Sequence, residues 1–121
     1  MKTILWIDDL RPAPEGYRHV YFVEEAISEI MRYEREQDWA MREYTLGHWD
    51  YEQTAKYYNT FTITEISCDN DLGEGNAEGY KLLDWLEITG RNKYPIHIHT
   101  DNAVARMRMK ATIQKNGWVE L

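Results

Sequence analysis

Acidic side chains gather directly after two short apolar runs of this chain. Asp8 and Asp9 end the first run, and Asp69 and Asp71 follow a β-branched run that closes at Cys68. Carboxylates that crowd together repel one another, so they either share protons or bind a hard cation. We therefore predict a metal site with Asp8, Asp9 and Asp69 as ligands. Oxygen ligands suit Mg²⁺ or Mn²⁺, and one of these is the expected cofactor.

A third polar group stands at the end of another short apolar run. His99, Thr100 and Asn102 supply an imidazole, a hydroxyl and an amide. Histidine exchanges a proton readily near neutral pH, so His99 is a predicted acid or base beside two catalytic carboxylates, those of residues 69 and 71. Arg11, Asn70, Thr100 and Asn102 are the predicted binding residues for a phosphate. Together these residue types indicate phosphoester chemistry.

Each of these features also has a simpler structural interpretation. Aspartates at strand ends often cap the helices that follow them. His97 and His99 share one face of a strand, which suits two ligands of a transition metal but equally suits packed or exposed side chains. Residues 91–115 hold six basic groups and one acid. These basic side chains either form a solvated helix face or attract a small phosphorylated ligand.

Hydrophobic periodicity places the polar groups at strand ends. Short β-rich runs alternate with helical spacing, which predicts an α/β domain with a mainly parallel sheet. Ligands of such sheets bind beyond the carboxyl ends of the strands. The predicted strands are 4–7, 19–23, 61–68 and 95–100, with a last one at 118–121, and the predicted helices are 24–36, 78–89 and 102–116.

Residues 37–60 are longer than an ordinary connection between a helix and a strand. This segment carries two tryptophans and four tyrosines, so we expect additional helical structure there. Packing is the simpler role for these aromatic side chains, and a surface for a protein partner or for base stacking is the other.

Composition limits the class of protein. The 121 residues carry a formal charge of −7, with 43% hydrophobic and 13% aromatic residues, which fits one folded domain over 1–121 with an insertion at about 37–60. No apolar run approaches the roughly 20 residues of a membrane span, and the apolar start of the chain runs into two aspartates, unlike a signal peptide. The single Cys68 excludes an internal disulfide. We expect a cytoplasmic protein that does not bind duplex DNA.

The strand-end motifs resemble those of response-regulator receiver domains. The paired acids at 8 and 9, Asp69, Leu72, Gly79 and Thr100 match that pattern. The resemblance implies a receiver-like (flavodoxin-like) three-layer α/β sandwich, here truncated after the fourth βα unit. It also implies that the paired acids bind Mg²⁺. Gly73 stands where receivers usually have proline, and the receiver lysine after a fifth strand is missing.

A closer resemblance is to the cyclic-phosphate processing receiver domains of phages and bacteria. Their three blocks, Asp-Asp-x-Arg, Asp-His-Asp-Leu-Gly and His-Ser-x-Asn, correspond to residues 8–11, 69–73 and 99–102. Asn70 replaces the middle histidine of the second block, and an amide cannot exchange protons. Thr100 keeps the hydroxyl of the third block.

The resemblance implies a metal-dependent phosphodiesterase that acts on a cyclic phosphate, either a nucleotide or an RNA end. The alternative is a non-enzymatic binding module, phage-encoded, that sequesters a cyclic nucleotide or engages a host protein through residues 37–60. Asn70 and the missing lysine favour the second interpretation.

Overall fold

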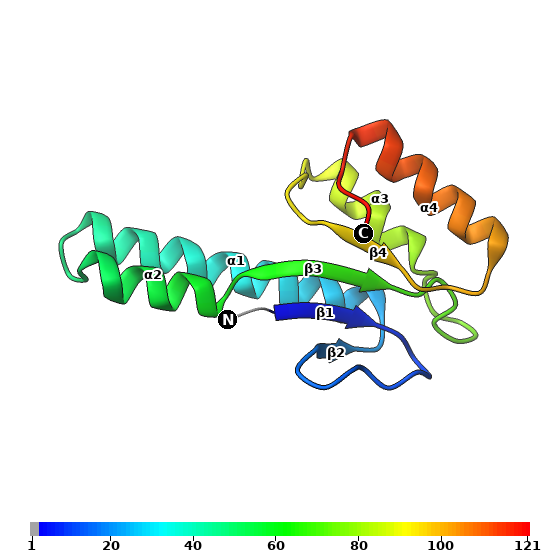
Figure 1. Cartoon of the computed structure of the whole chain (residues 1–121), viewed down its shortest axis with the longest axis horizontal. Helices are drawn as coiled ribbons and strands as arrows, with labels where there is room; N and C mark the ends of the chain where they lie inside the picture. Colours follow the sequence, from blue (N-terminus) through cyan, green and yellow to red (C-terminus); the bar gives the residue numbers. More distant parts are fainter. Residues whose placement is uncertain (1–2) are drawn as a thin grey trace.

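Four parallel strands and four helices make up the computed structural model, which describes residues 3–121 (Figure 1). The sheet has the strand order β2-β1-β3-β4. Its strands are β1 (Thr3–Ile7), β2 (Arg18–Val20), β3 (Ile63–Cys68) and β4 (Ile96–Ile98). The helices are α1 (Val23–Thr45), α2 (Tyr51–Thr60), α3 (Tyr80–Ile88) and α4 (Ala103–Asn116). This arrangement confirms the predicted receiver-like α/β class.

One face of the sheet carries the hydrophobic core. Alternate strand residues point to the same face, so Leu5, Ile66 and Ile96, which are paired in register, lie side by side. They form one buried cluster with apolar side chains of α1, α3 and α4, among them Ile30 and Leu83. In Figure 1, α1 passes behind β1 and β3. The core therefore holds the strands whose carboxyl ends carry the polar residues.

The second face of the sheet carries polar and aromatic side chains. Trp6, His19, Ser67 and His97 stand in one row across the four strands. Helices α1, α3 and α4 all pack on the other face, so residues 3–121 form two layers at the sheet rather than the three expected. The reason is that the connection from β1 to β2 is a loop of ten residues with no helix.

Helix α1 extends well beyond the predicted end at residue 36. No glycine or proline interrupts the chain until Gly47, so the helical spacing continues to Thr45. Helix α2 then returns along α1, with the side chain of Asp50 accepting a hydrogen bond from the Gln53 N–H at its start. The helical structure expected at 37–60 is therefore present.

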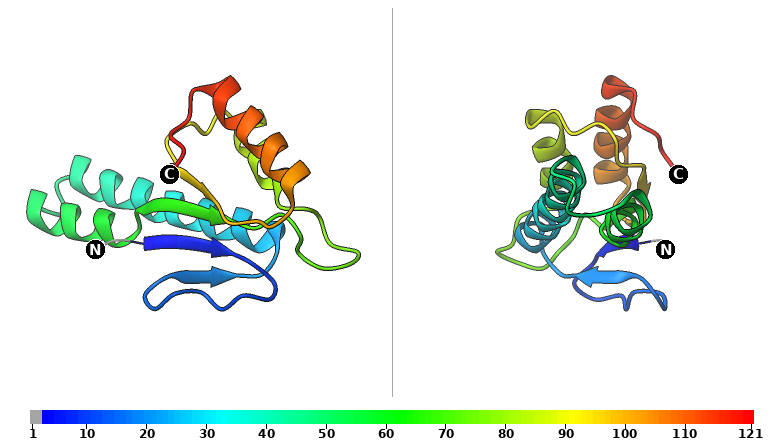
Figure 2. Two further views of the ribbon diagram at one scale, coloured as in Figure 1. Left: turned by 45° about the vertical axis from the view of Figure 1, so that its right-hand side comes forward. Right: turned by 90° about the vertical axis from the view of Figure 1, so that its left-hand side faces the viewer.

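The hairpin of α1 and α2 projects beyond the sheet in Figure 1 and in the left view of Figure 2. Edge-to-face contacts among Trp39, Trp49 and Tyr57 hold its two helices together, with ring centroids 5.0–5.5 Å apart. Three of the six aromatic side chains in 37–60 therefore pack against one another, and Tyr44 is exposed. Tyr51 and Leu46 remain exposed at the tip.

The other element boundaries differ from the predictions by a few residues. Strand β2 ends at Val20, because α1 begins at Val23 with Glu24 and Glu25 in its first turn, where acidic side chains favour the helix. The expected last strand is reduced to a single parallel bridge between Glu120 and Ile96. No helix among residues 3–121 is long and apolar enough to cross a membrane.

Gly79 brings the start of α3 against the end of β3. A Cβ atom at this position would lie 1.8 Å from the Asp69 carbonyl oxygen. We therefore expect Gly79→Ala to lower the free energy of unfolding by about 3 kcal/mol or more, because backbone must move to admit the methyl group. Urea unfolding followed by circular dichroism measures the loss.

Gly117→Ala is the comparison variant. Gly117 ends α4 with φ +67°, and open space surrounds its Cα, so alanine there costs only the left-handed backbone, about 1–2 kcal/mol. Equal losses in the two variants would contradict the steric argument at Gly79.

Candidate acidic site at the carboxyl edge of the sheet

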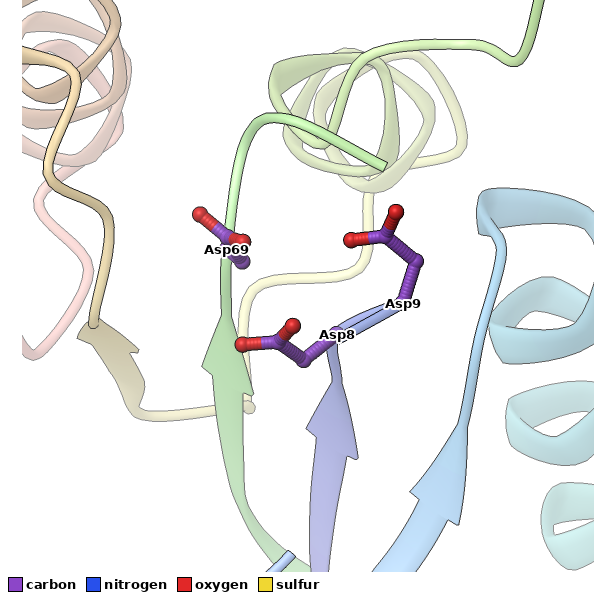
Figure 3. A group of neighbouring side chains, drawn as sticks. All are labelled: Asp8, Asp9 and Asp69. Atoms are coloured by element: carbon purple, nitrogen blue, oxygen red, sulfur yellow. The ribbon is translucent and has the colours of Figure 1, made fainter. Parts of the chain in front are cut away.

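Three carboxylates meet where β1 and β3 end. Asp8 and Asp9 follow β1, Asp69 follows β3, and one oxygen of each lies within 4.8 Å of the others (Figure 3). The two strands are parallel neighbours in the sheet, which brings their carboxyl ends together. Asp8 and Asp69 are buried and Asp9 is partly buried. The predicted metal ligands are thus brought into one group.

Asp8 is fixed by the protein on both carboxylate oxygens. Its Oδ1 accepts hydrogen bonds from the backbone N–H groups of Leu10 and Arg11, each at 2.9 Å, and its Oδ2 lies 3.1 Å from His99 Nε2. Burial opposes ionisation, but these hydrogen bonds outweigh it and hold the pKa of Asp8 below its ordinary value. Asp8 is therefore an ionised, oriented carboxylate.

At Asp69 burial outweighs the hydrogen bonds, the opposite of the situation at Asp8. Burial and the nearby charge of Asp8 raise the pKa of Asp69, and hydrogen bonds from the Thr100 hydroxyl and the Asn70 backbone N–H offset this only in part. Ionised Asp69 thus costs free energy in the fold. A cation beside it would remove that cost.

Asp9 supplies an oxygen that the fold leaves unused. Among the described residues, its Oδ1 is a buried side-chain atom without a hydrogen-bond partner. Buried carboxylate oxygens are normally hydrogen-bonded or bound to metal. Its Oδ2 faces Gly73, where a Cβ would approach to 3.2 Å. The unpaired oxygen and the two neighbouring carboxylates fit a hard divalent cation with oxygen ligands.

His99 lies beside Asp8 with both ring nitrogens engaged. Nε2 faces Asp8 Oδ2, and Nδ1 lies 2.8 Å from the Ser67 hydroxyl. Burial lowers the pKa of His99, although the Asp8 carboxylate opposes the shift. A proton transfer by His99 to a substrate, as predicted, therefore requires one of these two contacts to break.

Arg11 closes the site on the other side. Its guanidinium donates to the His99 carbonyl oxygen and to the Asp101 carboxylate, both at 2.6 Å. The Arg11 side chain is 43% exposed and that of Asp101 is 95% exposed. A phosphate could replace Asp101 as the partner of Arg11 without disturbing buried groups.

Amide side chains organise the rim of the site. The Asn70 carboxamide is buried, accepts from the Tyr80 N–H at the start of α3, and donates to Asp71 at 3.3 Å. Asn102 caps α4 by accepting from the Ala105 N–H, and its own backbone N–H donates to the Thr100 hydroxyl. Both amides thus accept from a backbone N–H at the start of a helix, a role that the simpler interpretation had given to the aspartates.

Asp71 and Asn102 also contact each other, with 3.4 Å between the Asn102 amide nitrogen and Asp71 Oδ1. Asp71 is exposed at the rim. The predicted residues at 69–71 and 99–102 therefore lie around the carboxylate group, and Asp71 is an exposed acid at its rim.

Sequence reasoning missed Ser67 and His19. Ser67 contacts His99 from within β3, and His19 Nε2 lies 2.8 Å from the Asp8 carbonyl oxygen. The alternation of side chains along β3 and β4 could have placed Ser67 and His97 on one face, but only the strand register shows that they touch.

A four-stranded parallel sheet of this order, with acidic residues at the ends of its two central strands, defines a receiver-like α/β protein. A family model described as "Cyclic-phosphate processing Receiver domain" matches residues 3–115. The chain belongs to this family. Searches of curated proteins and of solved structures gave no match.

The opposite pKa shifts predict opposite effects of neutralising two neighbouring acids. Without metal at neutral pH, Asp8→Asn should lower the free energy of unfolding by about 1–3 kcal/mol, because an NH₂ group replaces the acceptor facing His99. Asp69→Asn should raise the free energy of unfolding, because it removes a buried charge. Urea unfolding with chelator present measures both, with exposed Asp38→Asn as the control.

The pH dependence follows from the same shifts. Asp8 stabilises the fold above the unfolded-state pKa of about 3.9, and this contribution is lost as pH falls through its lower folded-state pKa. The cost of ionised Asp69 appears as pH rises from about 3.9 through its raised pKa. The free energies of unfolding of Asp8→Asn and Asp69→Asn should therefore approach each other as the pH is lowered. A difference between them that does not change with pH would contradict the opposite pKa shifts assigned to Asp8 and Asp69.

Proposed function

We propose that this chain binds and hydrolyses a cyclic phosphate at the acidic site. The observation that carries the proposal is the group of three carboxylates within 4.8 Å, one of which keeps a buried oxygen without a partner. Such a group is costly unless a cation joins it. Membership of the cyclic-phosphate processing family supports a phosphorylated substrate.

Asp9 and Asp69 would hold the divalent cation, Mg²⁺ or Mn²⁺, with Asp8 assisting. A cation bound there would neutralise charge on the phosphoryl oxygens and make water a better nucleophile. Asp8 is held by three hydrogen bonds, so it would contribute mainly negative charge at a fixed position.

Arg11, Asn102 and the first turn of α4 would bind the phosphate. Arg11 is the cation nearest the acids, and α4 presents backbone N–H groups at its start. Thr100 is buried, and its hydroxyl lowers the pKa of Asp69, so it would help to orient that carboxylate. Hydrolysis adds water across one ring P–O bond and leaves a monoester and a hydroxyl. Asp71, exposed at the rim, can accept the proton of the attacking water.

Turnover of 2′,3′- and 3′,5′-cyclic nucleotides, with and without Mg²⁺ or Mn²⁺, tests the proposal. We expect metal-dependent monoester product. Asp9→Asn and Asp69→Asn should each lower turnover more than about 100-fold, because removing a ligand should cost at least as much as removing one of its supporting partners. Asp38→Asn, an exposed acid away from the site, is the matched control.

Metal-independent turnover, or full activity in Asp69→Asn, would contradict the proposed site. Calorimetric titration of the same nucleotides into the protein separates a failure of binding from a failure of chemistry.

A non-enzymatic binding module is the second candidate. Both ring nitrogens of His99 are engaged, and the Asn70 amide, which cannot exchange protons, is used at the start of α3. These contacts favour binding without turnover. The hairpin tip adds a cavity of about 290 Å³ between α1 and α2, lined in part by Met41 and Tyr44, where a host protein would bind.

Under this second proposal a cyclic nucleotide binds saturably and is recovered unchanged. Arg11→Ala should then weaken binding by about tenfold or more, because a charged hydrogen bond to phosphate is lost. Arg35→Ala, an exposed arginine on α1, is the control.

A further inference from the structure

Ser67 lies between two histidines on the second face of the sheet. Its hydroxyl oxygen is 2.9 Å from His97 Nδ1 and 2.8 Å from His99 Nδ1. Ser67 is fully buried, and His97 is its register partner on β4. The contacts continue from His99 Nε2 to Asp8 Oδ2 at 3.1 Å. Four side chains thus form one line that ends at the acidic site.

Counting hydrogens fixes the direction of each hydrogen bond in this line. The ionised Asp8 carboxylate can only accept, so His99 Nε2 carries a hydrogen and donates it. A neutral His99 then has a lone pair on Nδ1, which accepts from the Ser67 hydroxyl. That hydroxyl has a single hydrogen, so His97 Nδ1 must donate to Ser67. Neutral His99 therefore requires one particular tautomer of each histidine.

The size of Ser67 also sets the position of the His99 ring. His99 follows β4, yet its ring stacks on Trp6 of β1, with centroids 3.9 Å apart and planes 7° apart. It reaches Trp6 by crossing over β3 at Ser67. A larger side chain at position 67 would fill the space that the imidazole occupies.

We propose that Ser67 and His97 are positioning residues of the acidic site. Together they fix the tautomer and orientation of His99, so that its Nε2–H stays on Asp8. The consequence for metal binding rests on the proposed function; the tautomers do not. Removing groups that orient metal ligands typically costs 10–100-fold in affinity, and a loss of about tenfold is expected here.

Nitrogen-15 NMR of the four imidazoles tests the tautomers directly. At roughly pH 8, above the ordinary pKa of histidine, we expect hydrogen on Nε2 of His99 and on Nδ1 of His97. Ser67→Ala should remove the preference of His97 for carrying its hydrogen on Nδ1. His97 carrying its hydrogen on Nε2 in the parent, or an unchanged spectrum in Ser67→Ala, would overturn the proposal.

Binding of Mn²⁺ alone, followed by electron paramagnetic resonance, tests the consequence. Ser67→Ala should weaken Mn²⁺ binding about tenfold, and His97→Phe should weaken it less. His97→Asn should restore parental affinity, because its amide N–H can donate in place of Nδ1–H. Ser28→Ala and His48→Asn, both away from the site, are matched controls. Parental circular dichroism in each variant excludes loss of the fold as the cause.

The two ways of failing are distinguishable. A parent protein that binds no Mn²⁺ but shows the expected tautomers would contradict the metal site and leave the positioning network standing. Equal Mn²⁺ affinity in the parent and in Ser67→Ala would contradict the positioning network and leave the metal site standing.

Discussion

Repulsion among three carboxylates at one edge of the sheet is the constraint on which the surrounding hydrogen bonds and burial act. Parallel pairing of β1 and β3 brings Asp8, Asp9 and Asp69 within 4.8 Å of one another. Each carboxylate is treated differently. Hydrogen bonds favour the ionised form of Asp8, burial disfavours the ionised form of Asp69, and Asp9 keeps a buried oxygen without a hydrogen-bond partner among the described residues. The fold therefore stabilises the charge of Asp8 and opposes that of Asp69, an imbalance that the proposed cation would correct.

The second face of the sheet explains how Asp8 can be held in this way. In a three-layer sandwich a helix would cover this face, and apolar side chains would fill it. Here Trp6 and Ser67 leave room for the His99 ring to cross the sheet toward Asp8. His19 adds a contact to the Asp8 carbonyl oxygen from β2. The absence of a helix between β1 and β2 and the polar support of the site are thus two aspects of one arrangement.

Sequence periodicity predicted the order of strands and helices along the chain well and the contacts between strands poorly. The parallel sheet and the meeting of the groups at 8–9, 69–71 and 99–102 follow from apolar runs that end in polar residues. The full length of α1 was missed, because nothing in the local spacing at residue 36 distinguishes a helix end from its continuation. Ser67 was missed for a different reason: a lone serine in a strand gains meaning only from register, which depends on pairing across the sheet.

Asn70 shows why a motif residue can be read correctly by type and still have another role. In the family pattern a histidine stands here, and its replacement by an amide removes a proton carrier. In the structure the carboxamide is buried, and its oxygen accepts from the Tyr80 N–H at the start of α3. Gly79, immediately before that helix, packs against the Asp69 carbonyl. Position 70 therefore holds the start of α3 next to Asp69 through the carboxamide oxygen of Asn70. The amide therefore removes a proton carrier from the rim while its oxygen holds the start of α3.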